Sequence, residues 1–307
     1  MTSSLTRADT VAVVVNWNRR ELTLRCLESL RAAEGPPLDI LVVDNASSDG
    51  SAEAIRERFP DVVLMENDEN LGFADGNNGG LRWALERDYT YVLLLNNDTV
   101  ASPELVSELR AYLERRPDAA AAGPAIHYLA DPNVIWSAGG WIDKRRGIVS
   151  NDFADVPAAE LPPQPYPVDH LSGCCMLLRA TAIERAGLLD SRFFMYFEET
   201  EWCVRLTRNG STLWVLPDVR LWHDVQPNQH IESRSVAYYM TRNRLLFLKA
   251  TGAPWTAWIY TLSSQARTVL ALFVRPRSLA RARGRMPMLW ALRDYLLGRY
   301  GRAQLNG

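Results

Sequence analysis

The sequence predicts an α/β protein whose central sheet is mostly parallel, with helices on both faces. Between residues 11 and 113, short apolar runs alternate with segments whose apolar residues recur at helical spacing. The runs are rich in Val, Ile and Leu, as expected for strands that are buried on both faces. Because this alternation occurs four times, the strands are expected to be parallel and covered by helices.

The expected elements follow one another closely along this part of the chain. In order they are strands at 11–15, 40–43, 62–65 and 91–95, with helices at 20–33, at 52–59, in a stretch ending at Leu85, and at 103–113. Polar residues at 44–50 suit the N-cap of the second helix. The Gly- and Asn-rich segment 70–80 leads into the third helix, on which Asn78 is expected to lie. Pro103 is expected in the first turn of the fourth.

The pattern loosens after residue 117. Glycines punctuate a hairpin or extended insertion over 135–149, and the Pro- and acid-rich segment 151–167 is expected to be a surface loop. The remaining expected elements are an apolar run at 168–178, a helix at 181–186 closed by Gly187, a strand at 213–216 and another short strand after it.

The net charge of −2 conceals two oppositely charged regions. Residues 240–307 contain twelve Lys and Arg and one acid, a net charge of +11, whereas the rest of the chain carries −13. A basic tail on an acidic body points to an anionic partner, either nucleic acid or a membrane surface. No recognised nucleic-acid motif accompanies the charge, so we expect no nucleic-acid partner.

The stretch 254–274 is long enough to span a membrane, but Arg267 near its middle is unfavourable in hydrocarbon. Its Trp, Tyr, Leu and Phe residues, followed by several arginines, favour a helix lying on a membrane surface. Packing of this helix on the core or on another subunit is the alternative, and a homo-oligomer stays open.

The expected compartment follows from the N-terminus and the cysteines. Residues 1–10 are polar and do not resemble a signal peptide. Cys26, Cys174, Cys175 and Cys203 form no CxxC pair, which favours reduced thiols. We therefore expect a cytoplasmic protein at the inner face of the cell membrane.

Polar side chains follow several of the expected strands. Asn16 and Asp44 follow the first two, and Asn96, Asn97 and Asp98 follow the fourth. In an open α/β sheet, ligands bind outside the carboxyl ends of the strands. Asp98 is therefore expected where a metal and a phosphate group would be handled; capping of the following helix is the simpler alternative.

Five segments, in order, resemble family-2 glycosyltransferases, specifically the rhamnosyltransferase-like branch. They are VVNWN at 14–18, VVDNASSDGS at 42–51, NLGF at 70–73, NND at 96–98 and FFMYFEETEW at 193–202. The resemblance implies a GT-A fold (Rossmann-like) at 1–239, with a nucleotide-binding half at about 10–117 and an acceptor half at about 118–239. Residues 240–307 would form a basic, aromatic-rich helical C-terminal region.

The resemblance also implies an inverting, metal-dependent transfer of a sugar. Such a transfer expels a nucleoside diphosphate, whose charge Mg²⁺ or Mn²⁺ would stabilise. Asp98 matches the last residue of the family's DxD-type motif, in which Asn96 replaces the first acid. By the same resemblance His223 completes the metal site, although a lone histidine is commonly structural or solvated.

Inversion by direct displacement needs one general base. Glu198 and Glu199 follow the aromatic run 193–197, where desolvation and a like-charged neighbour would raise a carboxyl pKa. The resemblance places the base at Glu199, with Glu198 supporting it by orienting a substrate hydroxyl or ordering the loop. A solvated acidic helix start that includes Glu201 is the alternative.

The nucleotide is expected between the first strands of the sheet. Asp44 could accept the N3–H that uracil and thymine share, so it would not distinguish UDP from dTDP. Asn16, Asn45 and Asn97 are further nucleotide-binding candidates, with turn chemistry as the alternative at Asn45. Gly72 would allow the backbone to approach a phosphate or ribose closely.

Four residues are candidates for the acceptor or the diphosphate. Tyr196 and Trp202 could line the apolar face of a sugar, or belong to the core. Arg242 and Arg244 could reach a diphosphate or an anionic lipid acceptor.

The expected reaction moves a sugar, with rhamnose favoured, from a dTDP- or UDP-linked donor to a saccharide or lipid-linked saccharide. Another hexose such as galactose or N-acetylglucosamine, or a non-catalytic nucleotide-sugar-binding or scaffold protein of the same fold, is the alternative. A processive synthase would show a QxxRW motif and several spans, and the sequence shows neither.

Overall fold

The structure is a computed structural model that describes residues 8–151, 153–225, 233–274 and 285–305. Its main sheet has the strand order β10-β12-β6-β11-β4-β1-β2-β3, with β5 paired to β12 and β7 to β6. The strands are β1 Thr10–Asn16, β2 Leu38–Asp44, β3 Val63–Glu66, β4 Tyr91–Asn96, β5 Thr99–Ala101, β6 Ala119–Tyr128, β7 Ile135–Ser137, β10 Tyr166–Val168, β11 Cys175–Arg179 and β12 Thr212–His223.

Parallel pairing dominates the part of the sheet that the sequence predicted. β1 pairs in parallel with β2 and β4, β2 with β3, and β6 with β12, whereas β11 runs antiparallel to β4 and β6. A separate hairpin joins β8 Ile142–Asp143 to β9 Ile148–Val149, as expected for an insertion in this region.

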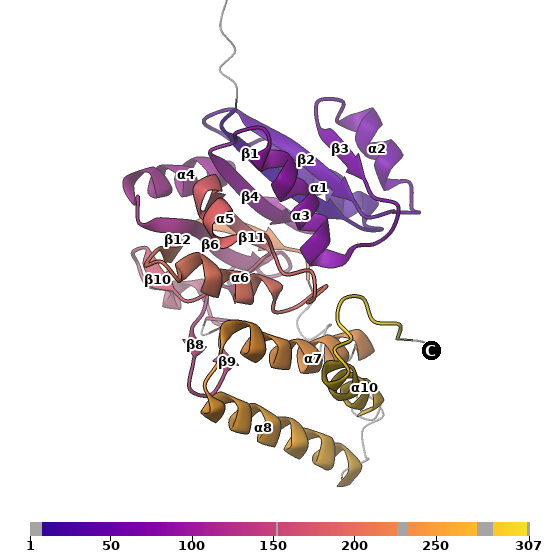
Figure 1. Ribbon diagram of the computed structural model, residues 1–307. Coiled ribbons are helices and arrows are strands. Elements are labelled where there is room, and N and C mark those ends of the chain that lie inside the picture. Colours follow the sequence, from indigo (N-terminus) through magenta and orange to yellow (C-terminus); the bar gives the residue numbers. More distant parts are fainter. Residues whose placement is uncertain (1–7, 152, 226–232, 275–284, 306–307) are drawn as a thin grey trace, which may run out of the picture.

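Helices cover both faces of the sheet (Figure 1). They are α1 Arg20–Arg31, α2 Ser51–Arg58, α3 Gly72–Leu85, α4 Leu105–Arg115, α5 Ala180–Ala186 and α6 Glu198–Thr207. Along β1, Val11 and Val13 pack in a core cluster with residues of α3, α5 and α6, whereas Ala12 and Val14 pack with α1, α2 and α4. The two-residue period of the strand therefore supplies both cores.

Two details of the predicted elements were wrong, at Pro103 and in β12. The Gly- and Asn-rich segment belongs largely to the third helix, since α3 begins at Gly72. A Cβ at Gly80 would lie 2.3 Å from Val13 Cγ1, so close packing of helix on strand requires glycine and overrides its low helix propensity. Pro103 lies before α4, and β12 is one strand whose register shifts between Leu216 and Arg220.

A helical layer lies against one edge of this α/β body (Figure 1). It consists of α7 Arg234–Thr251, α8 Trp255–Val274 and α10 Arg285–Leu296, so the helix expected at 254–274 is present. The composition boundary expected at 239/240 falls inside α7. None of the helices in the described part of the chain is long and apolar enough to cross a membrane.

Candidate active site

The ends of β1, β2 and β4 form one side of a cavity of about 500 Å³, which we call the donor crevice. The register pairs Asn16 with Asp44 and places Asn96 beside Val15, so the expected polar side chains converge at one edge of the sheet. Among its lining residues are Arg19, Asn45, Gly72, Asn97, Asp98 and Arg302.

Asn16 holds the polar groups of the crevice together. Its side-chain amide donates to Asp44 Oδ1 at 2.6 Å and to Ser47 Oγ at 3.0 Å. Its amide oxygen accepts from Thr23 Oγ1 at 2.7 Å and from Asn97 Nδ2 at 2.9 Å. The side chain is fully buried, so in this structure Asn16 positions its neighbours and does not line the crevice itself.

Asp44 and Asn45 are also tied into this network. Asp44 is buried, and its second oxygen accepts from the Ser47 backbone N–H at 2.8 Å. Asn45 donates to the carbonyl oxygen of Gly72 at 3.0 Å and accepts from Asn67 at 2.8 Å. Asn45 lines the donor crevice and Asp44 lies behind it, so the lining amide is held in one orientation by hydrogen bonds.

Packing against Phe194 is one reason why residue 72 is glycine. Its φ is +77°, and a Cβ there would lie 2.6 Å from the ring and the carbonyl oxygen of Phe194. The same carbonyl accepts from the Phe73 N–H at 2.8 Å. Phe194 therefore makes a close approach at Gly72 that a side chain would block, and Gly72 also lines the donor crevice, so its contact with a phosphate or ribose stays a prediction.

Asp98 and His223 face each other although 125 positions separate them in the chain. Nε2 of His223 lies 3.0 Å from Oδ1 of Asp98, because β5 pairs with the end of β12. Burial on its own raises the pKa of the Asp98 carboxyl, but the hydrogen bond and charge of His223 outweigh it and leave the pKa below its ordinary value. Asp98 is thus held as a carboxylate.

The residues at this position fit a divalent cation that shares its coordination with a substrate. A carboxylate oxygen and an imidazole nitrogen point to one place beside the donor crevice. Within the described residues, no group of three or more His, Cys, Asp and Glu side chains could hold a metal. A cation here would take its other ligands from phosphate oxygens and water, as Mg²⁺ commonly does.

The loop that precedes α6 has an unusual backbone. Phe194, Tyr196 and Phe197 all have positive φ, at 67°, 66° and 73°. Bulky side chains rarely adopt this conformation, which is unfavourable by about 1–3 kcal/mol at each residue. Other contacts must therefore hold loop 193–197 in place.

Neighbouring residues of α7 supply these contacts, and we call Arg242 and Asn243 the α7 clamp. Asn243 Nδ2 lies within hydrogen-bond distance of the carbonyl oxygens of Phe193, Met195 and Tyr196, at 2.9, 2.7 and 2.9 Å. Arg242 donates to the carbonyl oxygen of Phe193 at 3.1 Å. Both side chains are buried, so they hold the loop from its inner side.

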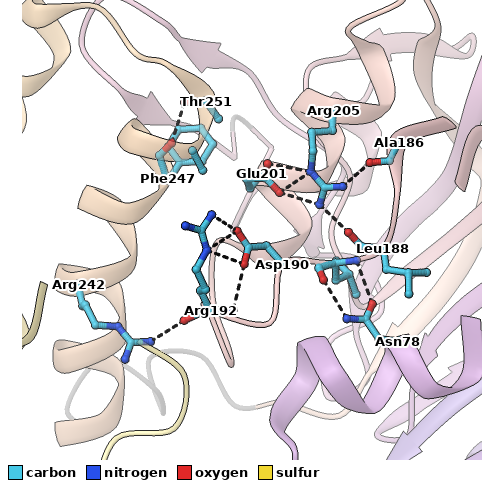
Figure 2. Close-up of polar contacts among 12 residues, drawn as sticks. Asn78, Ala186, Leu188, Asp190, Arg192, Glu201, Arg205, Arg242, Phe247 and Thr251 are labelled. Atoms are coloured by element: carbon cyan, nitrogen blue, oxygen red, sulfur yellow. Dashed lines mark hydrogen bonds and ion pairs between the residues drawn. The ribbon is translucent and has the colours of Figure 1, made fainter. Parts of the chain in front are cut away.

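The segment just before the loop is held from both sides (Figure 2). Asn78 of α3 exchanges two hydrogen bonds of 2.9 Å with the backbone of Leu189. Arg205, paired with Glu201 at 2.8 Å, donates to the carbonyl oxygens of Ala186 and Leu188. Glu201 is therefore a structural acid, unlike the two glutamates that precede it.

Glu198 and Glu199 begin α6, directly after the loop. Burial, followed by the charge of Glu199, raises the pKa of Glu198 well above its usual range. Burial also raises the pKa of Glu199, an effect that backbone N–H groups and the charge of His170 only partly offset. Oε2 of each carboxyl is buried and has no hydrogen-bond partner among the described residues.

Glu199 lines a second cavity, of about 460 Å³, which we call the acceptor cavity. Tyr196 and Arg244 line it too, as their assignment to an acceptor or diphosphate would require. Its remaining walls include Ile148, His170, Thr241, Gln265 and Met288. The cavity thus lies between the α/β body and the helices α7, α8 and α10.

The two other candidates for the acceptor lie elsewhere. Trp202 is fully buried in the core of the α/β body, and its indole N–H donates to the carbonyl oxygen of Gly187 at 2.7 Å. Arg242 is 1% exposed and its guanidinium is taken up by backbone carbonyls, including Gly301 at 2.8 Å. Assigning these two side chains to an acceptor or diphosphate was wrong, because neither can reach a ligand.

Several lining residues were missed by the sequence reasoning. His170 acts electrostatically on Glu199, and its Nε2 lies 2.9 Å from the Ser150 carbonyl oxygen. Arg19 and Arg302 bring cationic side chains to the donor crevice from opposite ends of the chain. Asp169-His170 before an apolar run was a signal in the sequence, whereas nothing near Arg302 marked it as part of the crevice.

A mostly parallel sheet covered on both faces, with an acid and its partners at the strand ends, is the arrangement of GT-A glycosyltransferases. The sequence bears this out, because residues 11–187 match glycosyl transferase family 2. The chain belongs to this family and is a glycosyltransferase.

Curated relatives are similar over most of the chain. The N-acetylglucosaminyl-diphospho-decaprenol L-rhamnosyltransferase of Mycobacterium tuberculosis is 29% identical over 273 residues, covering 81% of this chain and 86% of the relative. The dTDP-rhamnosyl transferase RfbF of Shigella flexneri is 24% identical over 260 residues, covering 79% and 81%. The resemblance to the rhamnosyltransferase-like branch is therefore confirmed.

Solved structures confirm the fold. The mannosyltransferase PcManGT from Pyrobaculum calidifontis, in complex with GDP-Man and Mn²⁺, has a TM-score of 0.59 at 17% identity and covers 96% of this chain and 84% of its own. GalNAc-T7 with UDP, GalNAc and Mn²⁺ has a TM-score of 0.61 at 15% identity over 78% of this chain. The match spans about half of that second protein, 47% of its length.

Proposed function

We propose that this glycosyltransferase inverts the anomeric carbon of its sugar, with Glu199 as general base and an acceptor hydroxyl as nucleophile. The position of Glu199 carries this proposal. Its carboxyl lies in a cavity beside the donor crevice and has a raised pKa. One of its oxygens accepts no hydrogen bond from any described residue. A carboxyl pKa raised toward neutrality makes a better base at physiological pH.

In the proposed step, Glu199 takes the proton of the acceptor hydroxyl while that oxygen bonds to the anomeric carbon. The bond between this carbon and the diphosphate breaks on the opposite side, and the nucleoside diphosphate leaves. His170 and Tyr196 line the same cavity and would contact the acceptor. The α7 clamp would fix the loop before Glu199, so that the carboxylate stays aligned.

Asp98 and His223 would hold Mg²⁺ or Mn²⁺ at the end of β4. The cation would neutralise charge that develops on the leaving diphosphate. Arg19 is placed to assist, since it lines the donor crevice and its charge acts on Asp98. The Mn²⁺ named with both structural neighbours supports the use of a divalent ion.

For the donor we propose a dTDP- or UDP-linked sugar, with rhamnose favoured. Asn45 and Asn97 would contact the nucleotide from the crevice wall. Asp44 lies behind Asn45 in this structure, and it would accept the base N3–H in exchange for its hydrogen bond with Asn16 or Ser47. The named activities of the Mycobacterium and Shigella relatives support rhamnose. Galactose or N-acetylglucosamine remains the alternative.

For the acceptor we propose a saccharide on a lipid carrier, met at the cytoplasmic face of the membrane. Four residues of α8 form an exposed apolar stripe at helical spacing, namely Trp255, Ile259, Leu262 and Leu270. The surrounding region carries the basic excess, so this face would contact anionic headgroups as well as lipid chains.

Thermal unfolding with UDP, dTDP or GDP, each with and without Mn²⁺ or Mg²⁺, tests the donor site. Metal-dependent stabilisation by dTDP or UDP supports it, and no response to any nucleotide contradicts it. Product analysis then tests the reaction: wild-type protein should transfer rhamnose from dTDP-rhamnose with inversion, detected by NMR of the new linkage. Nucleotide binding without transfer of any sugar would favour the non-catalytic alternative.

A further inference from the structure

Arg244 is a cation inside the acceptor cavity that no acid of the described chain neutralises. It lines the same cavity as Glu199, yet no ion pair joins the two, and no hydrogen bond or salt bridge to its guanidinium exists within the described residues. Desolvation lowers the pKa of Arg244, and the electrostatic influence of Tyr260 offsets only part of this lowering. A partly desolvated, unpaired cation favours an anionic ligand.

Gln265 of α8 is the second unsatisfied group in this cavity. It is 7% exposed, and its Nε2 donates to the Thr241 carbonyl oxygen at 3.1 Å. Its Oε1 is buried with no partner among the described residues. A buried acceptor atom without a donor indicates a place where a ligand hydroxyl or a water molecule would donate a hydrogen bond.

Gln265 also lines a further cavity, of about 470 Å³, which we call the α8–α10 groove. The other lining residues are all aliphatic: Leu262, Ala266, Val269, Leu270 and Leu292. Leu262 and Leu270 are 49% and 64% exposed. The groove offers hydrocarbon contacts and shares Gln265 with the acceptor cavity, so the two cavities meet at one side chain and one amphiphile could occupy both.

We propose that Arg244 binds a phosphate of the acceptor and that the α8–α10 groove holds the polyisoprenyl chain attached to that phosphate. This inference rests on the function proposed for Glu199. The base acts on a sugar hydroxyl, the cation lines the same cavity, and Gln265 of that cavity also lines the groove. A base, a cation and an adjoining apolar groove match a saccharide joined through phosphate to a hydrocarbon chain.

Calorimetric titration of the full chain with farnesyl diphosphate tests the cation. Arg244→Gln should weaken binding about 10- to 100-fold, as expected for a charge-assisted hydrogen bond. The control is Arg267→Gln, which removes an exposed cation of α8 outside the cavity and should change binding less than twofold. The proposal is overturned if wild type does not bind, or if Arg244→Gln binds like wild type or no worse than the control variant.

Inorganic diphosphate and Leu292→Gln test the groove. The variant should bind farnesyl diphosphate at least fivefold more weakly than wild type, while its affinity for inorganic diphosphate is unchanged. An equal loss for both probes, or no loss for either, overturns the assignment of the hydrocarbon chain. Glu199→Gln should keep its affinity for farnesyl diphosphate while losing transfer, so a failed transferase assay and a failed binding assay contradict different proposals.

Discussion

The donor crevice and the acceptor cavity lie side by side but differ in how their polar groups are paired. On the donor side Asn16 bonds to both Asp44 and Asn97, and His223 Nε2 meets Asp98, so that among these groups only the buried Nδ1 of His223 lacks a partner in the described residues. In the acceptor cavity, Oε2 of Glu199 and Oε1 of Gln265 have no partner in the described part of the chain.

This difference separates two ways of building a site. The donor crevice holds its groups in place before a ligand arrives, so binding requires little reorganisation. The acceptor cavity leaves a base, an amide oxygen and a cation unsatisfied, and their partners must come from the substrate. Mutations in the acceptor cavity should therefore affect transfer and acceptor binding, whereas those in the donor crevice should affect nucleotide binding.

The largest expected effect belongs to the acceptor cavity. Glu199→Gln removes the proposed base and should lower kcat by about 10²- to 10⁴-fold, with nucleotide-dependent stabilisation retained. Rates of sugar transfer measured by chromatography check this. The matched control is Glu184→Gln, an exposed glutamate of α5, which should leave kcat unchanged. A kcat for Glu199→Gln within threefold of wild type would assign the proton to another group.

Asp98→Asn should give the next largest effect, on the donor side. At a hundred times its dissociation constant, nucleotide with metal stabilises the wild type by about 2.7 kcal/mol, and this increment should disappear. Differential scanning calorimetry with and without Mn²⁺ measures it. Asp218→Asn, an exposed acid of the same strand as His223, should keep the increment. Retention of the metal-dependent increment in Asp98→Asn would remove Asp98 from the metal site.

Asn243→Ala tests whether the α7 clamp serves the acceptor side alone. Losing its buried contacts with three loop carbonyls should lower the free energy of unfolding by about 1–3 kcal/mol. Because the loop leads directly into the start of α6, where Glu199 lies, kcat should fall while the nucleotide affinity stays within twofold. Urea unfolding and steady-state kinetics measure the two effects, with the exposed Asn133→Ala as control. Equal losses in kcat and nucleotide affinity would show that the two regions are not separable.

The smallest expected effect is a change in how stability depends on pH. The pKa of Glu198 is about 4.5 in the unfolded chain and higher in the folded protein. Between these two pKa values, the folded protein keeps a proton that the unfolded chain has released. Stability therefore falls as pH rises through this window. Glu198→Gln should make the fall shallower and give a higher Tm than wild type at pH 8. A steeper fall, or one identical to that of Glu184→Gln, would contradict the assignment.

The sequence predicted the donor crevice better than the acceptor cavity for a physical reason. Residues at the ends of successive parallel strands must meet at one edge of the sheet, so Asn16, Asp44 and Asp98 could be placed from the strand pattern alone. Their roles with a ligand stay predictions. The start of α3 at Gly72 could not be placed from the sequence, because packing against β1, not local propensity, makes its glycine-rich first half helical.

The acceptor cavity depends on contacts that no local pattern contains. Trp202 and Arg242 were assigned to ligands from residue type, but one faces the core and the other binds backbone carbonyls. Arg244 lies two residues from Arg242 and faces the cavity instead. Only the placement of α7 against the loop distinguishes the two arginines.

The α7 clamp constrains how members of this family could be recombined. A chimaera joined at residue 239 or 240 would take loop 193–197 from one parent and Asn243 from the other. The strained loop would then be held by a helix that did not evolve with it. Joining the parents after α7, at the left-handed Gly252, keeps the loop and its clamp together and exchanges only α8 and the residues beyond it. Crossovers at that glycine should yield active hybrids more often than crossovers inside the helix.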